Sequence, residues 1–270
     1  MGIDDTAVWV SNGERNTVVR VDSGTNTITD TVRVGSRPCC GLGIGFGSVW
    51  VPCCGQNQIC RIDQRTRKVL SCASIAVADS EGSIGIDSDS LWVITDRQGT
   101  LVRLDPSDNR VLVRIRTNPG SYAVAVGAGA VWITSADRDL LCRVDPHNNQ
   151  VTAQIPVGSS PRFLCTSDDA VWVVNQGDGT VSRVDPLTNE VAATVDVGTP
   201  GPGGDIATGE GAIWVSAVNT PLTRIDPGTN RVTVQYVGRG GDAVRVGHGS
   251  VWLASFLLQE LWRVRPPVVA

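Results

Sequence analysis

The 270-residue sequence predicts an all-β fold, a seven-bladed β-propeller whose blades are four-stranded antiparallel sheets. Three observations predict this fold. A tryptophan between two aliphatic residues recurs about every 40 residues, and an Arg-aliphatic-Asp triplet follows most of these tryptophans about a dozen residues later. Short stretches alternate apolar and polar residues and are rich in Val and Ile, which is typical of β-strands. A period of about 40 residues with four short strands per unit indicates a propeller.

The tryptophan motif divides residues 1–270 into seven repeats, which we expect to form a single domain. The spacings between successive tryptophans are 38 to 42 residues, too regular for unrelated segments. The seven repeats are centred on Trp9, Trp50, Trp92, Trp132, Trp172, Trp214 and Trp252.

Each repeat is expected to supply four strands, A to D, which the second repeat illustrates. Strand A is "LGIGFG" (42–47), strand B "VWV" (49–51), strand C "ICRID" (59–63) and strand D "VLSCASI" (69–75). Between strands C and D, runs such as "DPSDN" and "DPLTN" predict type I turns, because Pro presets the backbone and Asp bonds back to it.

The blade that closes the propeller is expected to be incomplete. The first repeat keeps only "MGID" of its A strand, and the last repeat ends at "LWRVRPPVVA", with almost no room for strand D. Either "PPVVA" supplies a stub, or the missing strand lay upstream of Met1. We favour the second, because a strand from the other terminus would cover an exposed sheet edge.

Two stretches resemble a known superfamily over their whole length. "VWVSNGERNTVVRVDSGTNTITDTVRVG" (8–35) and "VWVVNQGDGTVSRVDPLTNEVAATVDVG" (171–198) are similar to the repeats of YVTN-type and streptogramin B lyase-type β-propellers. The resemblance implies the propeller architecture. It leaves the function open, because binding scaffolds, sensors and enzymes share this fold.

In such a propeller the D-to-A and B-to-C connections meet at one rim, here called the first rim, and the A-to-B and C-to-D turns meet at the second rim. Ligand sites in the propellers that this chain resembles usually lie at the first rim. We therefore expect a polar, cysteine-flanked pocket there. The candidate ligand-binding residues are Asn12, Arg37, Glu81, Tyr122, Arg162, Asn175, Asp205 and Asp242.

Carboxylates among these residues could hold a hard divalent cation. Asp205, Asp242 and Glu81 are the candidate metal ligands, and Ca²⁺ or Mg²⁺ fits such oxygens better than Zn²⁺. The sequence has no compact calcium-loop motif, so the identity of a cofactor stays open.

Two Pro-Cys-Cys-Gly runs place four cysteines near the first rim of the second blade. If Ile44 pairs with Val49, the same register puts Cys40 opposite Cys53 and Cys39 opposite Cys54. Three interpretations stay open: disulfide staples or packed thiols, a thiolate site for zinc or copper(I), and a catalytic thiol. Elsewhere, Cys60, Cys142 and Cys165 are expected to be small packing residues, and Cys72 lies on a D strand.

The two histidines argue against histidine-dependent chemistry at the first rim. His147 lies in a C-to-D turn and His248 in an A-to-B turn, which places both at the second rim. Streptogramin B lyases use a histidine base and magnesium at the mouth, and no histidine here matches that position. The repeated arginines and aspartates, and the seven motif tryptophans, are expected to belong to the scaffold.

Composition excludes two classes of partner. The net charge is about −4 with no basic run, so nucleic acid is excluded as a partner. Apolar runs are far shorter than the roughly 20 residues of a membrane span. No signal peptide opens the sequence, so the protein is either cytoplasmic or a piece of a longer polypeptide; the resemblance favours an extracytoplasmic location.

Two functions follow from these residues. The first is a rigid module that binds a small molecule, a metal or a peptide at the first rim. The alternative is a metal-assisted hydrolase or lyase acting on an ester, lactone or phosphoester at the same place, without a catalytic histidine. The missing histidines favour the binding module, and the enzyme question stays open.

Overall fold

The computed structural model describes residues 1–39, 41–78, 83–201 and 203–266. The chain divides into two compact units: residues 1–126, 130–133 and 142–152, and residues 127–129, 134–141 and 153–270. Among the described residues there is no helix with the length and hydrophobicity that a membrane crossing requires. Whether residues 1–270 form one domain stays a prediction.

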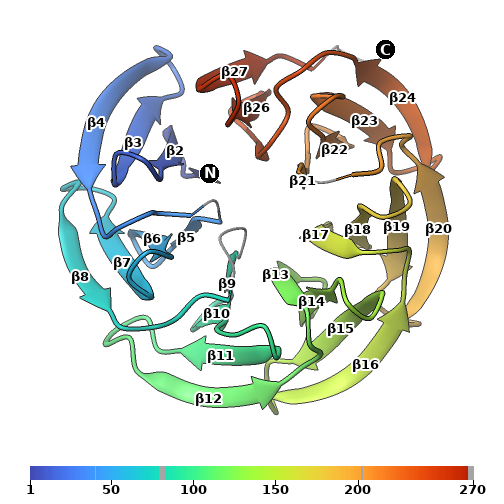
Figure 1. The fold of residues 1–270 in the computed structure, drawn as a ribbon, viewed down its shortest axis with the longest axis horizontal. Helices are drawn as coiled ribbons and strands as arrows, with labels where there is room; N and C mark the ends of the chain where they lie inside the picture. The colour runs from blue at the N-terminus through green and yellow to red at the C-terminus, as the bar shows by residue number, and fades with distance from the viewer. Residues whose placement is uncertain (40, 79–82, 202, 267–270) are drawn as a thin grey trace. The chain divides into compact units, whose positions relative to one another are not determined.

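Consecutive antiparallel strands form each sheet, or blade, and neighbours in the chain are neighbours in the sheet (Figure 1). Blade I contains β1 (Gly2–Ile3), β2 (Ala7–Asn12), β3 (Thr17–Asp22) and β4 (Thr27–Arg33). Blade II contains β5 (Gly43–Gly45), β6 (Ser48–Cys53), β7 (Gln58–Asp63) and β8 (Val69–Ala73). Blade III contains β9 (Ile84–Ile86), β10 (Leu91–Ile94), β11 (Thr100–Leu104) and β12 (Val111–Arg116).

The remaining sheets repeat this order. Blade IV contains β13 (Ser121–Gly127), β14 (Ala130–Ser135), β15 (Leu140–Asp145) and β16 (Gln150–Pro156). Blade V contains β17 (Pro161–Thr166), β18 (Val171–Asn175), β19 (Thr180–Asp185) and β20 (Glu190–Asp196). Blade VI contains β21 (Asp205–Gly209), β22 (Ala212–Ser216), β23 (Leu222–Asp226) and β24 (Arg231–Tyr236). Blade VII contains β25 (Val244–Gly247), β26 (Ser250–Ser255) and β27 (Glu260–Val264).

The sequence prediction of a seven-bladed β-propeller is therefore confirmed. Six of the sheets have four strands and the last has three within the described residues. The expected A-to-B register of blade II is also confirmed, because Ile44 lies opposite Val49 and Gly43 opposite Trp50.

Each motif tryptophan is buried, and those of blades I, II, III, V and VI pack against residues of the next blade, as expected. The Trp50 side chain of blade II packs in one cluster with Ile84, Leu91 and Val93 of blade III. Its indole N–H donates to the carbonyl of Gly45, five residues earlier, at 3.2 Å. The same five-residue step recurs elsewhere, as in the bond from Trp92 to the Asp87 carboxylate at 2.7 Å. A buried indole thus keeps its donor paired while its ring fills the space between two sheets.

Within the described part of the chain, strand C of six blades carries an arginine whose guanidinium lies over this indole ring. The guanidinium carbon lies 4.8 to 6.0 Å from the ring centroid. This distance allows a cation–π contact. The pairs are Arg61–Trp50, Arg103–Trp92, Arg143–Trp132, Arg183–Trp172, Arg224–Trp214 and Arg263–Trp252.

In blades II, III and V the same arginine reaches the next blade. Arg103 Nη1 donates to the Pro146 carbonyl at 2.7 Å and to Asn149 Oδ1 at 3.1 Å, and both acceptors belong to the C-to-D turn of blade IV. Arg61 makes the equivalent bond to the Pro106 carbonyl at 2.9 Å. The arginine therefore joins the core of its own blade to the turn of its neighbour.

The turn residues present these acceptors in a fixed geometry. Asp63 Oδ1 accepts from the backbone and side chain of Thr66 at 2.6 and 2.8 Å, and these bonds hold the pKa of Asp63 below its ordinary value. Asn149 ends its turn at φ 60°, a left-handed conformation that Asn tolerates better than most residues. The turn sequence is thus part of the contact between blades.

Replacing Arg103 with methionine should lower the free energy of unfolding by about 2 kcal/mol, because a cation–π contact and hydrogen bonds to a charged group contribute roughly 1–2 kcal/mol each when half-buried. Urea unfolding measures the change. Arg114→Met is the matched control, since Arg114 is exposed on β12 of the same blade. Equal effects of the two substitutions would contradict a structural role for the Arg103 contacts.

Candidate functional site

The first rim of blades VI and VII contains a buried ion pair. Asp205 begins β21 and its carboxylate accepts from the guanidinium of Arg245 on β25. The carboxylate also accepts from the backbone N–H of Val244 at 3.2 Å. The Asp205 side chain is only 12% exposed, so the pair is largely withdrawn from water.

Arg245 was not among the predicted site residues, although the sequence holds a signal for it. The residue opposite the motif tryptophan on the inner strand is small in other blades: it is Gly43 opposite Trp50 and Ala207 opposite Trp214. In blade VII it is Arg245 opposite Trp252. A charge at a position of small residues marks this strand as different.

Asp205 also acts on a neighbouring cysteine. Cys165 lies on β17, and its pKa is raised by burial and then by the negative charge of Asp205. The thiol is thus kept protonated and unreactive, in agreement with the expected packing role of Cys165.

Of the other predicted residues of the second unit, Asp242 lies three residues before Arg245, and Arg162 lies on β17. The backbone carbonyl of Asp242 accepts from the Ser216 hydroxyl, which ties the D-to-A loop of blade VII to β22. Arg162 lies at a β-bulge, where the pairing of β17 with β18 shifts between Pro161 and Phe163. Bulges of this kind redirect a side chain out of the regular alternation.

The Asn175 side chain forms hydrogen bonds inside blade V. It is fully buried, and its amide nitrogen donates to Thr180 and Ser182, both at 2.9 Å. A Cβ placed on Gly158 would lie 2.4 Å from that nitrogen, so only glycine fits beside it. Asn175 is the least accessible of the predicted ligand-binding residues that the structure describes.

In the first unit, the predicted residues lie at the ends of separate strands. Asn12 ends β2, and its Oδ1 accepts from the Arg15 backbone at 3.0 Å. Arg37 is exposed at φ 51°, and its backbone N–H donates to Asn16 Oδ1 at 2.8 Å. Tyr122 lies half-buried on β13. The convergence of these residues with those of the second unit on one pocket stays a prediction.

The geometry around Asp205 does not support its predicted role as a metal ligand, because its carboxylate is already paired with the guanidinium of Arg245. Glu81 lies outside the described residues. Over residues 1–39, 41–78, 83–201 and 203–266, no three His, Cys, Asp or Glu side chains are grouped so that they could hold a metal ion.

The cysteine-rich end of blade II contains one of the predicted staples. Cys39 and Cys54 form a disulfide, with Cα atoms 6.2 Å apart. The ladder at this end is offset from the predicted register, because Pro38 rather than Cys40 lies opposite Cys53. Cys40 lies outside the described residues, and Cys53 is a buried thiol. Because Cys39 and Cys54 are bonded to each other, their sulfurs are not thiolate ligands for zinc or copper(I).

A second disulfide corrects the interpretation of Cys60 and Cys72. Cys60 was expected to be a packing residue, but it lies directly opposite Cys72 in the pairing of β7 with β8 and is bonded to it. The comparison of C strands alone could not find this pair, because the partner lies on strand D of the same blade. Cys142 agrees with its expected packing role: it is a fully buried thiol, and burial raises its pKa to about 12.

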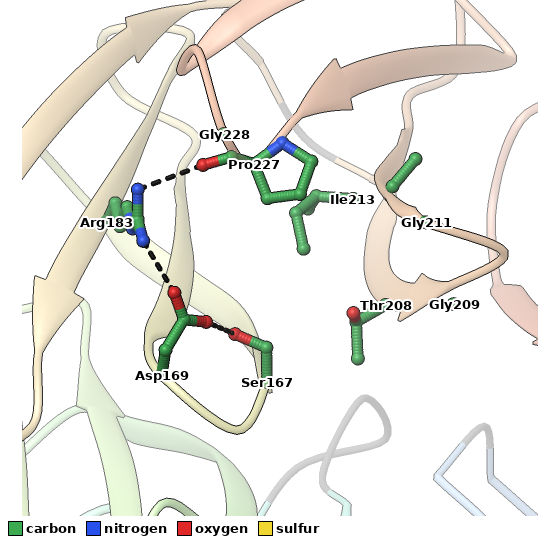
Figure 2. Close-up of a pocket in the computed structure, with 10 residues that line it drawn as sticks. Ser167, Asp169, Arg183, Thr208, Gly209, Gly211, Ile213, Pro227 and Gly228 are labelled. Carbon is green, nitrogen blue, oxygen red and sulfur yellow. Dashed lines mark hydrogen bonds and ion pairs between the residues drawn. The ribbon is translucent and has the colours of Figure 1, made fainter. Parts of the chain in front are cut away.

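A hollow of about 330 Å³ lies at the second rim between blades V and VI, on the side opposite the predicted site (Figure 2). Arg183 crosses it, donating to Asp169 at 2.7 Å and to the Pro227 carbonyl at 2.9 Å. A hydrogen bond from Ser167 and the nearby Arg183 charge hold the pKa of Asp169 below its ordinary value, against the raising effect of burial. Figure 2 shows Ser167, Asp169, Arg183 and the Pro227 carbonyl paired with one another, as expected of scaffold.

Solved structures match almost the whole chain. A streptogramin B lyase structure aligns with a TM-score of 0.78 and 19% identity, covering 94% of this chain and 88% of the other. Hydrazine synthase of Kuenenia stuttgartiensis aligns with a TM-score of 0.80 and 12% sequence identity, covering 98% of this chain and 94% of the other. BamB from Moraxella catarrhalis aligns with a TM-score of 0.69 and 15% sequence identity, covering 94% of this chain and 81% of the other.

The chain has the streptogramin B lyase-type propeller fold. This agrees with the resemblance seen in its repeats and, at these identities, establishes the fold alone. No protein-family model matches the chain, and no curated protein matches it.

The histidine-and-magnesium site that the resemblance implies does not fit these residues. His147 lies in the turn between β15 and β16, and His248 in the turn between β25 and β26. The His147 side chain is exposed, and its ring nitrogen lies 3.1 Å from the Asp145 carboxylate of the same turn. Both positions belong to the second rim of their blades.

Replacing Arg245 with methionine should lower the free energy of unfolding by about 2 kcal/mol, because it leaves a nearly buried carboxylate without its cation. The double variant Asp205→Asn/Arg245→Met should be more stable than the single Arg245→Met variant, since it removes the unpaired charge. Thermal and urea unfolding measure both. Unchanged stability of Arg245→Met would show that the Asp205 carboxylate does not depend on this pair and is available to a ligand.

Proposed function

We propose that the chain is a binding module that recognises an apolar peptide segment at the first rim of blades VI and VII. The observation that supports it is a run of three exposed apolar residues, Phe256, Leu257 and Leu258, in the B-to-C loop of blade VII. Phe256 is 66% exposed and Leu257 is 61% exposed. Contiguous exposed apolar side chains mark interaction surfaces more often than isolated ones do.

Comparison with the other repeats sets this loop apart. The four residues at the same distance after the motif tryptophan are "GERN" in blade I, "CGQN" in blade II, "ADRD" in blade IV and "QGDG" in blade V. In blade VII they are "FLLQ". The fold does not require a run of apolar residues there, since none of the other six copies has two large apolar residues in succession, "VNTP" of blade VI included. A partner is the physical reason for exposing them.

The neighbouring loop extends the same surface. Val237, which is 85% exposed, and Tyr236 lie where β24 ends and the D-to-A connection begins. This connection approaches the Phe256 loop closely at Gly240: a Cβ placed there would lie 3.0 Å from Leu258 Cδ1. We define the apolar rim patch as Tyr236, Val237, Phe256, Leu257 and Leu258.

Polar anchors lie near this connection along the chain. Asp242 follows Gly240 by two residues, and Arg245 lies on β25, to which the connection leads. Asp205, the partner of Arg245, begins β21 of blade VI. Apolar contacts would then provide most of the binding free energy, and these polar groups would fix the orientation of the peptide. A small molecule remains the second ligand class for the same groups.

The pairing of Asp205 with Arg245 favours this binding function over the metal-assisted hydrolase. A catalytic cation at Asp205 would have to displace a guanidinium that is already bonded to the carboxylate. The two disulfides, Cys39–Cys54 and Cys60–Cys72, further support a location in an oxidising, extracytoplasmic compartment.

A random dodecamer peptide library selected on the immobilised protein tests the proposal. Synthetic copies of the selected peptides should be rich in aromatic and aliphatic residues. They should bind Phe256→Ser/Leu257→Ser at least tenfold more weakly than the unchanged chain, because burial of two large apolar side chains contributes more than about 1.4 kcal/mol. Isothermal titration calorimetry gives the dissociation constants.

Leu187→Ser is the matched control, since Leu187 is 90% exposed but lies in a C-to-D turn at the second rim of blade V. It should leave the peptide affinity unchanged. Selected peptides that bind the Phe256→Ser/Leu257→Ser variant as tightly as the unchanged chain would overturn the proposal.

A further inference from the structure

Three cysteines of blade II form a cluster that the proposed binding function does not use. Cys60 on β7 and Cys72 on β8 are joined by a disulfide. Cys53, the last residue of β6, is a buried thiol whose sulfur lies 3.8 Å from the sulfur of Cys60. A thiol is thus held in contact with one sulfur of a disulfide.

The two ends of the disulfide differ in their surroundings. Cys53 and Cys60 have no exposed surface, whereas Cys72 is exposed on the outermost strand of its blade. In thiol–disulfide exchange, a thiolate attacks one sulfur of a disulfide and the other sulfur leaves as a thiolate. The leaving thiolate is stabilised when water can reach it, so attack on Cys60 with departure of Cys72 is the favoured direction.

We propose that Cys53, Cys60 and Cys72 form an internal thiol–disulfide exchange site that presents a reactive thiol at Cys72. The Cys53 sulfur attacks the Cys60 sulfur, the Cys60–Cys72 bond breaks, and a Cys53–Cys60 bond forms. The proton lost from the Cys53 thiol is balanced by the proton taken up by the Cys72 thiolate. One disulfide and one thiol are present before and after, so the step needs no external oxidant or reductant.

The strand geometry permits both pairings. Cys60 lies opposite Cys72 in the ladder of β7 with β8. In the ladder of β6 with β7, Cys60 lies opposite Val51 and Cys53 opposite Gln58, so Cys53 and Cys60 are diagonal neighbours on one face. The central Cys60 can therefore bond to either side, and the side chosen decides whether strand β8 carries a free thiol.

Packing holds the Cys53 sulfur beside the Cys60 sulfur. The Cys53 sulfur lies against Gly35, since a Cβ placed on Gly35 would come within 3.1 Å of it. Burial raises the pKa of the Cys53 thiol, so little thiolate forms and the exchange is slow. The resulting thiol on β8 is available to thiol-reactive molecules, such as a low-molecular-weight disulfide, which makes Cys72 a modification site.

Trypsin separates the two outcomes, because the sites Arg33, Arg61, Lys68 and Arg97 place Cys53 and Cys60 in the peptide 34–61 and Cys72 in the peptide 69–97. The full-length native protein is incubated without reductant at pH 8.5 with N-ethylmaleimide, then quenched in acid, digested and analysed by mass spectrometry. The expected result is loss of the link between the two peptides, with maleimide on Cys72 and a disulfide between Cys53 and Cys60.

Cys53→Ala should lower the rate of Cys72 labelling at least tenfold and keep the two peptides linked. Cys142→Ala is the matched control, since Cys142 is a buried thiol of another blade, and it should label Cys72 as the unchanged protein does. If Cys53→Ala does not fold, the peptide map of the unchanged protein decides by itself. The proposal is overturned if Cys72 of the unchanged protein stays linked to Cys60, or if a folded Cys53→Ala variant labels at the same rate.

Discussion

The structure depends on a contact of blades II, III and V, in which an arginine of strand C lies over the tryptophan of its own blade and bonds to the turn of the next. Arg183 illustrates it, with its guanidinium 5.3 Å from the Trp172 ring and 2.9 Å from the Pro227 carbonyl of blade VI. Over the described residues, successive sheets share no backbone ladder, so side chains set how they stack. The indole provides the buried area, and the arginine fixes the neighbouring turn against it.

This scaffold leaves the loops free to differ, and the differences identify where function is expected. Blade II replaces the polar residues of its first rim with cysteines, and blade VII replaces "GERN"-like loops with "FLLQ". Blade VII also places Arg245 at a position where the inner strands of blades I, II, III, V and VI have glycine, alanine or cysteine, and pairs it with Asp205. Each departure costs stability or solubility unless something compensates for it, which is why these positions and not the repeated Arg/Asp stripe point to binding or chemistry.

The repeat period predicted the fold well, because every repeat carries the same strand and turn signals. The A-to-B register of blade II followed from the turn at Phe46–Ser48, and Ile44 does lie opposite Val49. The site was harder to predict. Cys60–Cys72 depends on the C-to-D ladder, which shifts register between Arg61 and Ile62, and period counting does not reveal such a shift. Arg245 could have been found by aligning the inner strands on their motif tryptophans, which puts a charge where the other aligned strands have small residues, but its partner Asp205 lies in another blade and the repeat pattern does not reveal that contact.

A double-mutant cycle on Arg183 and Asn230 tests the central claim most directly. Asn230 Oδ1 accepts from Arg183 Nη1 at 3.1 Å, and Asn230→Gly removes this acceptor without straining a residue at φ 55°. Urea unfolding of Arg183→Met, Asn230→Gly and the double variant should give a coupling energy of about 1 kcal/mol, as expected for contacting residues in one network. A coupling energy of about zero would show that Arg183 and the Asn230 side chain act independently and would contradict the account of a network that joins blade V to the turn of blade VI.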